Sequence, residues 1–157
     1  MCVFFLYWVS KSLSYRDDSQ DSDPKLPLIT YRSLPVSPPL ANPRRANGPR
    51  VFSLVLAFPL PIDFEFKWAE DNQIGIGKNR FVRRNLVLPA ILKRLTPDCR
   101  RIAAVPLGNG AGCYSIVVAT NKTVEDLERA KYLEMIRSVQ RVLGTVDPPA
   151  WYRPRRT

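Results

Sequence analysis

Two segments in the middle of the chain carry strand-like patterns of apolar positions. The first, residues 51–58 with the sequence VFSLVLAF, is a continuous apolar run bounded by Pro49 and Pro59, which is typical of a buried strand. The second, residues 62–68, alternates apolar and charged positions and has aromatic side chains at every second position from 64. Period-two alternation places apolar and charged side chains on opposite faces of a strand, so we predict a second strand here.

Two longer segments follow helical spacing. The apolar face predicted for the first consists of Phe81, Leu88, Leu92 and Leu95. This helix spans residues 79–95, with Arg83 and Arg94 near its opposite face, and we expect Pro89 to kink it or to divide it into two. The strongest helix prediction covers residues 123–144, where a T-x-x-D start precedes apolar positions spaced i, i+3, i+4 and i+7 and a glycine ends the pattern.

A hairpin is predicted between these two helices. Residues 101–107 and 113–120 are apolar runs rich in β-branched side chains, and a glycine-rich connection joins them. The predicted order of elements is therefore ββαββα. Because each element has an apolar face to bury, we expect an α+β fold with two layers, in which four mostly antiparallel strands carry two helices on one face.

Proline marks the boundary of the predicted domain. Nine of the 15 prolines lie between positions 24 and 61, and each removes an amide donor that a helix or a central strand needs. We therefore predict an irregular, disordered Pro-rich leader over residues 1–50, a compact basic α+β domain over 51–147 and an exposed basic tail over 148–157. The first nine residues are nearly all apolar, but a spanning helix needs about 20 residues, so we expect no membrane span.

Positive charge is concentrated in residues 74–101. The chain has 24 Lys and Arg against 14 Asp and Glu, a formal net charge of +10, and this segment alone holds eight cations and one acid. Such an excess favours contact with nucleic acid or another polyanion, and arginine suits bidentate contact with phosphate. The predicted polyanion-binding residues are Lys78, Arg80, Arg83, Arg84, Arg94, Arg100 and Arg101. The sequence GIGK at 75–78 matches neither the Walker pattern nor the dinucleotide pattern.

The absence of histidine excludes several kinds of chemistry. No Ser-His or Cys-His pair, histidine base or His-containing zinc site can form, and the three cysteines have no CxxC spacing. We therefore expect no metal site and no cofactor, and the chain is more consistent with a binding protein than with an enzyme. An odd cysteine count without a secretory disulfide pattern indicates an intracellular protein, either cytoplasmic or nuclear.

The Pro-rich segment contains one candidate recognition motif. Arg32, Pro35 and Pro38 form a basic P-x-x-P arrangement that resembles an SH3-domain ligand in the polyproline II conformation. The first functional hypothesis is a non-enzymatic basic binding module that contacts nucleic acid or another polyanion, such as an acidic protein, through residues 78–101. The alternative is a protein-interaction or scaffold domain that uses helix 123–144 and the Pro-rich segment. A small enzyme acting on a phosphorylated ligand comes third.

Overall fold

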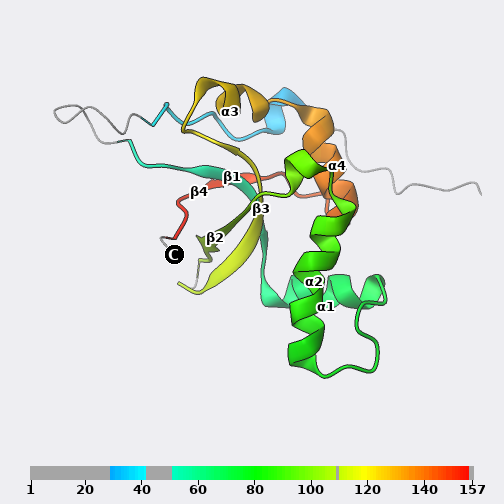
Figure 1. The fold of residues 1–157 in the computed structure, drawn as a ribbon. Coiled ribbons are helices and arrows are strands. Elements are labelled where there is room, and N and C mark those ends of the chain that lie inside the picture. Colours follow the sequence, from blue (N-terminus) through cyan, green and yellow to red (C-terminus); the bar gives the residue numbers. More distant parts are fainter. Residues whose placement is uncertain (1–28, 42–50, 109, 156–157) are drawn as a thin grey trace, which may run out of the picture.

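The computed structural model describes residues 29–41, 51–108 and 110–155 as an α+β fold with one four-stranded sheet (Figure 1). The strands are β1 (Val55–Leu60), β2 (Ile102–Pro106), β3 (Gly112–Thr120) and β4 (Ala150–Tyr152). The helices are α1 (Ile62–Asp71), α2 (Arg80–Arg94), α3 (Val124–Arg129) and α4 (Leu133–Leu143), with short 3-10 turns η1 (Tyr31–Ser33) and η2 (Pro97–Cys99).

The sheet is antiparallel and has the order β2-β3-β1-β4. The predicted buried strand at 51–58 and the predicted hairpin correspond to β1 and to β2-β3. β1 is central because it pairs with both β3 and β4, placing Phe58 opposite Ile116 and Leu56 opposite Trp151. The chain therefore follows the order βααββααβ within the described residues, and the predicted order ββαββα is wrong.

The prediction of a strand at residues 62–68 is wrong, because this segment forms the first two turns of α1. The side chains of Glu65, Trp68 and Ala69 are buried and Phe64 is half-buried, which is the i, i+1, i+4, i+5 spacing of a helix face. Seven alternating residues fit this spacing almost as well as they fit a strand. Acidic residues in the first turn also favour the helix, because they interact well with its positive N-terminal end.

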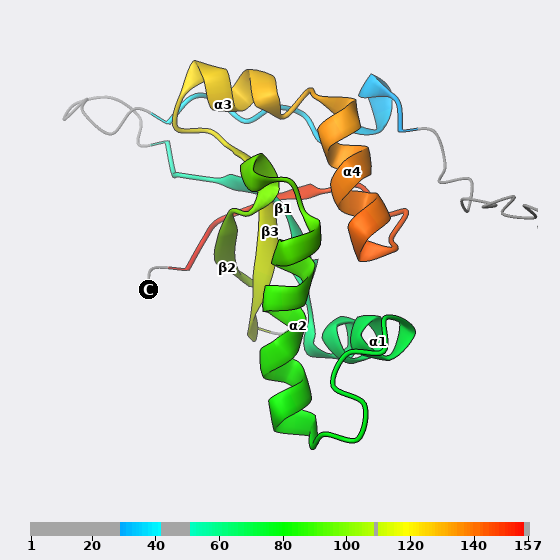
Figure 2. The ribbon, with the colours of Figure 1, turned by 45° about the vertical axis from the view of Figure 1, so that its right-hand side comes forward.

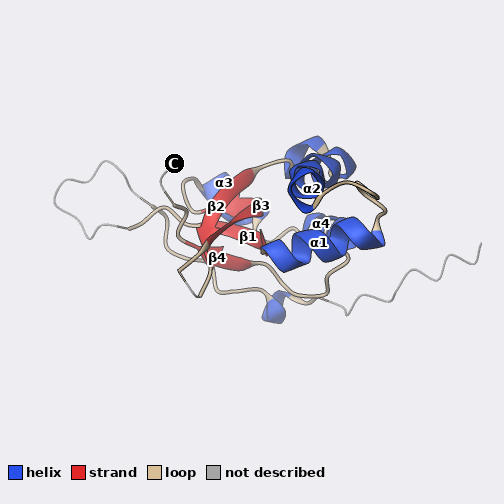
Figure 3. Cartoon of the chain, turned by 90° about the horizontal axis from the view of Figure 1, so that it is seen from below, coloured by secondary structure: helices blue, strands red, loops and turns tan. Residues whose placement is uncertain are grey.

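The main core lies between one face of the sheet and helices α1, α2 and α4 (Figures 2 and 3). Leu60 and Ile116 of the sheet pack in the same cluster as Val87 and Ile91 of α2 and Ile136 of α4. In addition, the indole Nε1 of Trp68 in α1 donates a 2.9 Å hydrogen bond to the backbone carbonyl of Val142, near the end of α4. Three helices therefore cover this face, where the sequence predicted two.

Helix α2 is a single helix over residues 80–94 despite its internal proline. Pro89 lies on the exposed side, so the Asn85 carbonyl that loses its amide partner can be solvated. The inward side chains are Val87 and Ile91, followed by Leu95 just beyond the helix. Of the predicted apolar face, Leu95 is buried and Leu88 and Leu92 are half-buried against the core, whereas Phe81 is exposed.

The long helix predicted over residues 123–144 is divided into α3 and α4 by a break at 130–132. Its predicted ends are confirmed: the hydroxyl of Thr123 accepts a 3.1 Å hydrogen bond from the Asp126 amide, and Gly144 has φ 67°. The break lets α3 lie along the end of the sheet while α4 turns onto its face (Figure 1).

Asn121 joins the segment 29–41 to the sheet. Its fully buried side chain accepts from the Leu54 amide at 2.6 Å and donates to the carbonyls of Phe52 at 2.9 Å and Pro39 at 3.2 Å. Its own carbonyl accepts from the Ala41 amide at 2.7 Å. Because the side-chain amide of Asn121 both accepts and donates hydrogen bonds, it holds three segments of the chain together at one point.

Parts of the predicted leader and tail pack on the domain. Ile29 is 5% exposed and belongs to the main core, whereas residues 1–28 and 42–50 of the predicted leader lie outside the described residues. At the other end, residues 150–152 of the predicted tail form β4, and the Arg155 amide then donates to the carbonyl of Ala104 at 2.8 Å. The proposed domain boundaries stay predictions.

Candidate polyanion-binding surface

The densest positive charge lies on α2 and on the turn that precedes it. Between Asp71 and Asp98 the sequence contains no acidic residue, and its six cations are Lys78, Arg80, Arg83, Arg84, Lys93 and Arg94. Three of these positive charges, on Lys78, Arg80 and Arg83, lie at or just before the first turn of α2, where the helix dipole is itself positive. This is an arrangement that a bound anion would stabilise.

The turn between α1 and α2 is built by residues with left-handed backbone. Gln73, Gly75 and Gly77 have φ values of 55°, 65° and 73°. A Cβ on Gly75 would come within 3.3 Å of the Arg83 side chain, so glycine allows the turn to pack closely on α2. Asn79 then caps the helix by accepting a 2.9 Å hydrogen bond from the Val82 amide.

The two helices and this turn form one helix-turn-helix unit, here called the α1–α2 hairpin, in which α1 and α2 cross at a steep angle (Figure 2). Its turn and the N-terminal half of α2 project beyond the end of the sheet, at the opposite end of the molecule from α3 (Figure 2). The first turns of α2 therefore meet α1 but not the strands. Charge placed here lies on a part of the fold that protrudes beyond the sheet (Figure 2).

The arginines in the first turns of α2 contact α1. The Nε of Arg84 lies 2.9 Å from Oε2 of Glu65, whose side chain is only 4% exposed, and the Arg80 guanidinium lies 4.3 Å from the centre of the Phe66 ring. Arg83 is half-buried, and its Nε has no hydrogen-bond partner among the described residues. A crevice of about 400 Å³ at this point is lined by Asp63, Phe66, Glu70, Lys78, Arg80 and Arg83.

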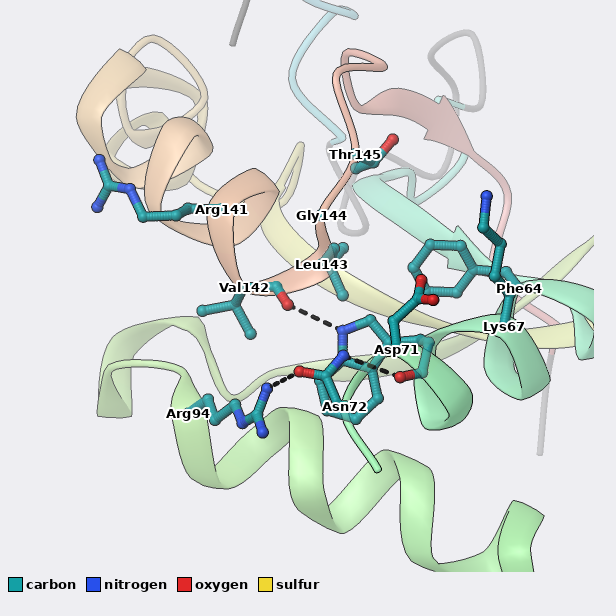
Figure 4. Close-up of a pocket in the computed structure, with 11 residues that line it drawn as sticks. Phe64, Lys67, Asp71, Asn72, Arg94, Arg141, Val142, Leu143, Gly144 and Thr145 are labelled. Carbon is teal, nitrogen blue, oxygen red and sulfur yellow. Dashed lines mark hydrogen bonds between the residues drawn. The ribbon is translucent and has the colours of Figure 1, made fainter. Parts of the chain in front are cut away.

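Arg94 lies at the other end of α2, away from this group. It donates to the amide oxygen of Asn72 and stacks 5.0 Å from the centre of the Trp68 ring, beside a cavity of about 510 Å³ (Figure 4). Figure 4 shows the two other cations of this cavity, Lys67 and Arg141, on opposite sides of it. Because the three positive groups do not converge, the cavity offers no common point for one anion. Arg94 and Arg141 occupy the last turns of their helices, where a cation interacts favourably with the dipole.

Arg100 and Arg101 have structural partners on other elements. The Nε of Arg100 donates to the Leu95 carbonyl at 3.0 Å. Arg101 makes two hydrogen bonds to the carboxylate of Asp126, at 2.9 and 3.1 Å, and Thr120 donates to the same carboxylate at 2.6 Å. The hydrogen bonds from Arg101 hold the pKa of Asp126 below its ordinary value. The structure therefore separates these two arginines from the α1–α2 hairpin.

The outward side of α2 carries apolar groups that the sequence prediction missed. Val82, Leu86 and Pro89 are spaced i, i+4 and i+7, and all three are exposed. Phe81, which we had expected to face the core, is 74% exposed beside them. The signal in the sequence is a second apolar stripe, parallel to the one that contains Val87 and Ile91. Periodicity alone does not tell which stripe faces the sheet.

The residues of the two protein-interaction hypotheses lie elsewhere. Arg32 is exposed in η1, while Pro35 and Pro38 are half-buried. A partner that contacts both prolines would therefore require this segment to move away from the rest of the domain. The SH3-ligand hypothesis stays a prediction. On α4, Ile136 and Val139 are fully buried, so the apolar face of this helix belongs to the core.

Three comparisons of this chain with known proteins found no match. No family model matches the chain, and neither a curated protein nor a solved structure matches it. Within residues 29–41, 51–108 and 110–155, Cys, Asp and Glu side chains form no group of three or more that could hold a metal ion. No helix in the same part of the chain is long and apolar enough to cross a bilayer.

Proposed function

We propose that this chain is a basic, non-enzymatic binding module that contacts a polyanion through the α1–α2 hairpin. One observation supports this most directly: residues 72–97 hold six cations and no acid. The exposed members of this set are Lys78, Arg80, Arg84, Lys93 and Arg94. Lys78, Arg80 and Arg84 lie on the protruding part of the hairpin and Lys93 and Arg94 at the other end of α2, so a large anionic surface could contact cations along the helix.

The hairpin also holds its arginines in place before binding. Glu65 anchors Arg84 by its Nε, and the Phe66 ring supports Arg80. Restricting a long side chain in advance lowers the conformational entropy that binding would otherwise cost. The acids of α1 reduce the local charge, so the net +10 of the whole chain adds long-range attraction, which salt screens over about 8 Å at physiological ionic strength.

The test is heparin binding by a charge-matched pair of variants. The α2 triple replaces Lys78, Arg80 and Lys93 by Gln, and the control triple replaces Arg32, Lys122 and Lys131 by Gln, so both lose three positive charges from exposed sites. Since each phosphate or sulfate contact adds to the salt dependence, we expect the α2 triple to weaken heparin binding about tenfold or more at ~150 mM salt. The control triple should lose less than about threefold.

The measurement is a titration with a fluorescent heparin oligosaccharide at several salt concentrations, with circular dichroism to check that each variant is folded. The α2 triple should also show a shallower dependence of log K on log salt concentration. Equal losses in the two triples would mean that net charge alone binds heparin, and the assignment to the α1–α2 hairpin would then be wrong.

A further inference from the structure

The outward face of α2 is apolar although the helix carries five cations and no acid. Val82, Leu86 and Pro89, here called the outer stripe, lie along one line of the helix, and Phe81 adjoins them. On the opposite side, Arg80 and Arg84 contact α1. A helix on the surface of a soluble domain normally has the reverse arrangement, with charge outward and apolar groups inward.

Two lysines bracket the outer stripe. Lys78 lies four residues before Val82, and Lys93 lies four residues after Pro89, in the last turn of α2; both are exposed. Ile76 adds a further apolar side chain, 68% exposed, on the turn that leads into the helix. The outer stripe thus spans eight residues of the helix, or roughly 12 Å, with a cation beyond each end.

This combination fits the interface of an anionic lipid bilayer. Apolar side chains can enter the boundary between head groups and acyl chains, while long lysine and arginine side chains extend to the phosphates above it. Anionic head groups also attract a cluster of basic residues. The protruding position of the α1–α2 hairpin lets a flat surface reach this face of α2 without contacting the sheet (Figure 2).

Two other occupants fit the surface less well. A nucleic acid would use the cations but would leave Ile76, Val82 and Leu86 facing phosphate and water, because its backbone offers no apolar phase. A second copy of the chain would bring together two helices that each carry five cations and no acid, and these like charges would repel. A bilayer accounts for both the apolar and the basic groups.

We propose that the polyanion bound by the α1–α2 hairpin is the surface of an anionic membrane, on which α2 lies with its outer stripe inserted at the interface. This inference rests on the proposed polyanion-binding function and specifies its partner. Electrostatic attraction brings the hairpin to the surface, and insertion of Phe81, Val82 and Leu86 retains it there. Binding should therefore need both anionic lipid and the exposed apolar side chains.

The experiment is vesicle co-sedimentation of the full chain, with a variant that leaves charge unchanged. Wild type should bind vesicles of phosphatidylcholine with about 30 mol% phosphatidylserine and should not bind vesicles of phosphatidylcholine alone. The double variant Phe81→Ser, Leu86→Ser should bind the anionic vesicles about tenfold or more weakly because it loses interfacial insertion, yet it should keep wild-type affinity for heparin. The control Tyr132→Ser, Val146→Ser removes two apolar side chains that are 63% and 50% exposed on other elements, and it should bind like wild type.

The outcomes separate this inference from the function on which it rests. Anionic-vesicle binding that is unchanged in Phe81→Ser, Leu86→Ser would overturn the insertion. Wild type that binds heparin and a single-stranded oligonucleotide but not anionic vesicles would overturn the membrane assignment and leave the polyanion-binding function standing. If the folded wild-type protein binds neither anionic vesicles nor heparin, the proposed function is overturned as well.

Discussion

Helices α2 and α4 both have an amphipathic sequence, yet the structure uses their apolar sides differently. In α4, Ile136, Val139 and Leu143 are buried in the core, and the charged positions face solvent. In α2, Val87 and Ile91 are buried, but Val82 and Leu86 remain exposed. The same kind of pattern therefore supplies packing in one helix and an apolar surface in the other.

The difference follows from what each helix packs against. The apolar stripe of α4 is covered, because its buried residues pack in the main core with residues of the strands, α1 and α2. The N-terminal half of α2 extends beyond the sheet and packs on α1, which offers Glu65 and Phe66 to the arginines Arg84 and Arg80 (Figure 2). A neighbour with a buried carboxylate and an aromatic ring orients these two cations toward α1, although both stay partly exposed. The apolar residues on the other side of α2 are then left outward.

The largest expected effect comes from placing a charge on the buried side of α4. Ile136 is fully buried, so Ile136→Asp puts a carboxylate into the core and should lower the free energy of unfolding by about 4 kcal/mol or more, enough to unfold a marginal domain. Urea unfolding followed by circular dichroism would measure it. A folded variant with near wild-type stability would mean that α4 does not cover the sheet.

The next largest effect is expected for the ion pair between Arg84 of α2 and Glu65 of α1. Arg84→Ala leaves the buried Glu65 carboxylate without its partner, and because the Arg84 side chain is itself 44% exposed, we expect a loss of about 2 kcal/mol in the free energy of unfolding. The matched control is Arg80→Ala, which removes only the stacking on Phe66 and should cost about 0.5 kcal/mol. Equal losses in the two variants would contradict the anchoring role of Glu65.

A smaller, pH-dependent effect is expected for the ion pair between Asp126 of α3, the helix beside α4, and Arg101, which directly precedes β2. The folded-state pKa of Asp126 lies below its ordinary value of 3.8, so this pair stabilises the fold above that pH and its contribution is lost as the pH falls through the folded-state pKa. Asp126→Asn should lower the free energy of unfolding by about 1 kcal/mol at pH 7, since Arg101 is partly exposed. Urea unfolding at several pH values should show the gap between wild type and variant closing below pH 3.8. A gap that does not change with pH would exclude the ion pair as its source.

The smallest expected effect is on the outward side of α2. Leu86→Asp makes the same kind of change as Ile136→Asp but at a position that is 43% exposed, so the free energy of unfolding should change by about 0.5 kcal/mol or less. The measurement is urea unfolding beside the α4 variant. A loss close to that of Ile136→Asp would show that Leu86 is buried in solution, and the outer stripe would not be a free surface.

Several parts of the fold could be predicted from local pattern. The apolar run of β1, the hairpin β2-β3 and the two ends of the α3–α4 segment, with Thr123 and Gly144, each carry a signal that depends on only a few neighbouring residues. The segment 62–68 could not be assigned in this way, because seven residues fit a strand and a helix nearly equally well. Burial of Trp68 against α4 distinguishes the two, and that contact joins residues 74 positions apart.

The candidate surface shows the same division. The amino-acid sequence by itself determined that residues 72–97 carry six cations without an acid, that histidine chemistry is absent and that the chain can form an α+β fold. Only the tertiary structure decided that Arg94 lies away from the arginines in the first turns of α2 and that Arg100 and Arg101 have partners outside the hairpin. It also decided that the apolar stripe with Val82 and Leu86 faces outward. The physical reason is that charge and periodicity are local properties of a chain, whereas the direction of a helix face depends on the elements packed against it.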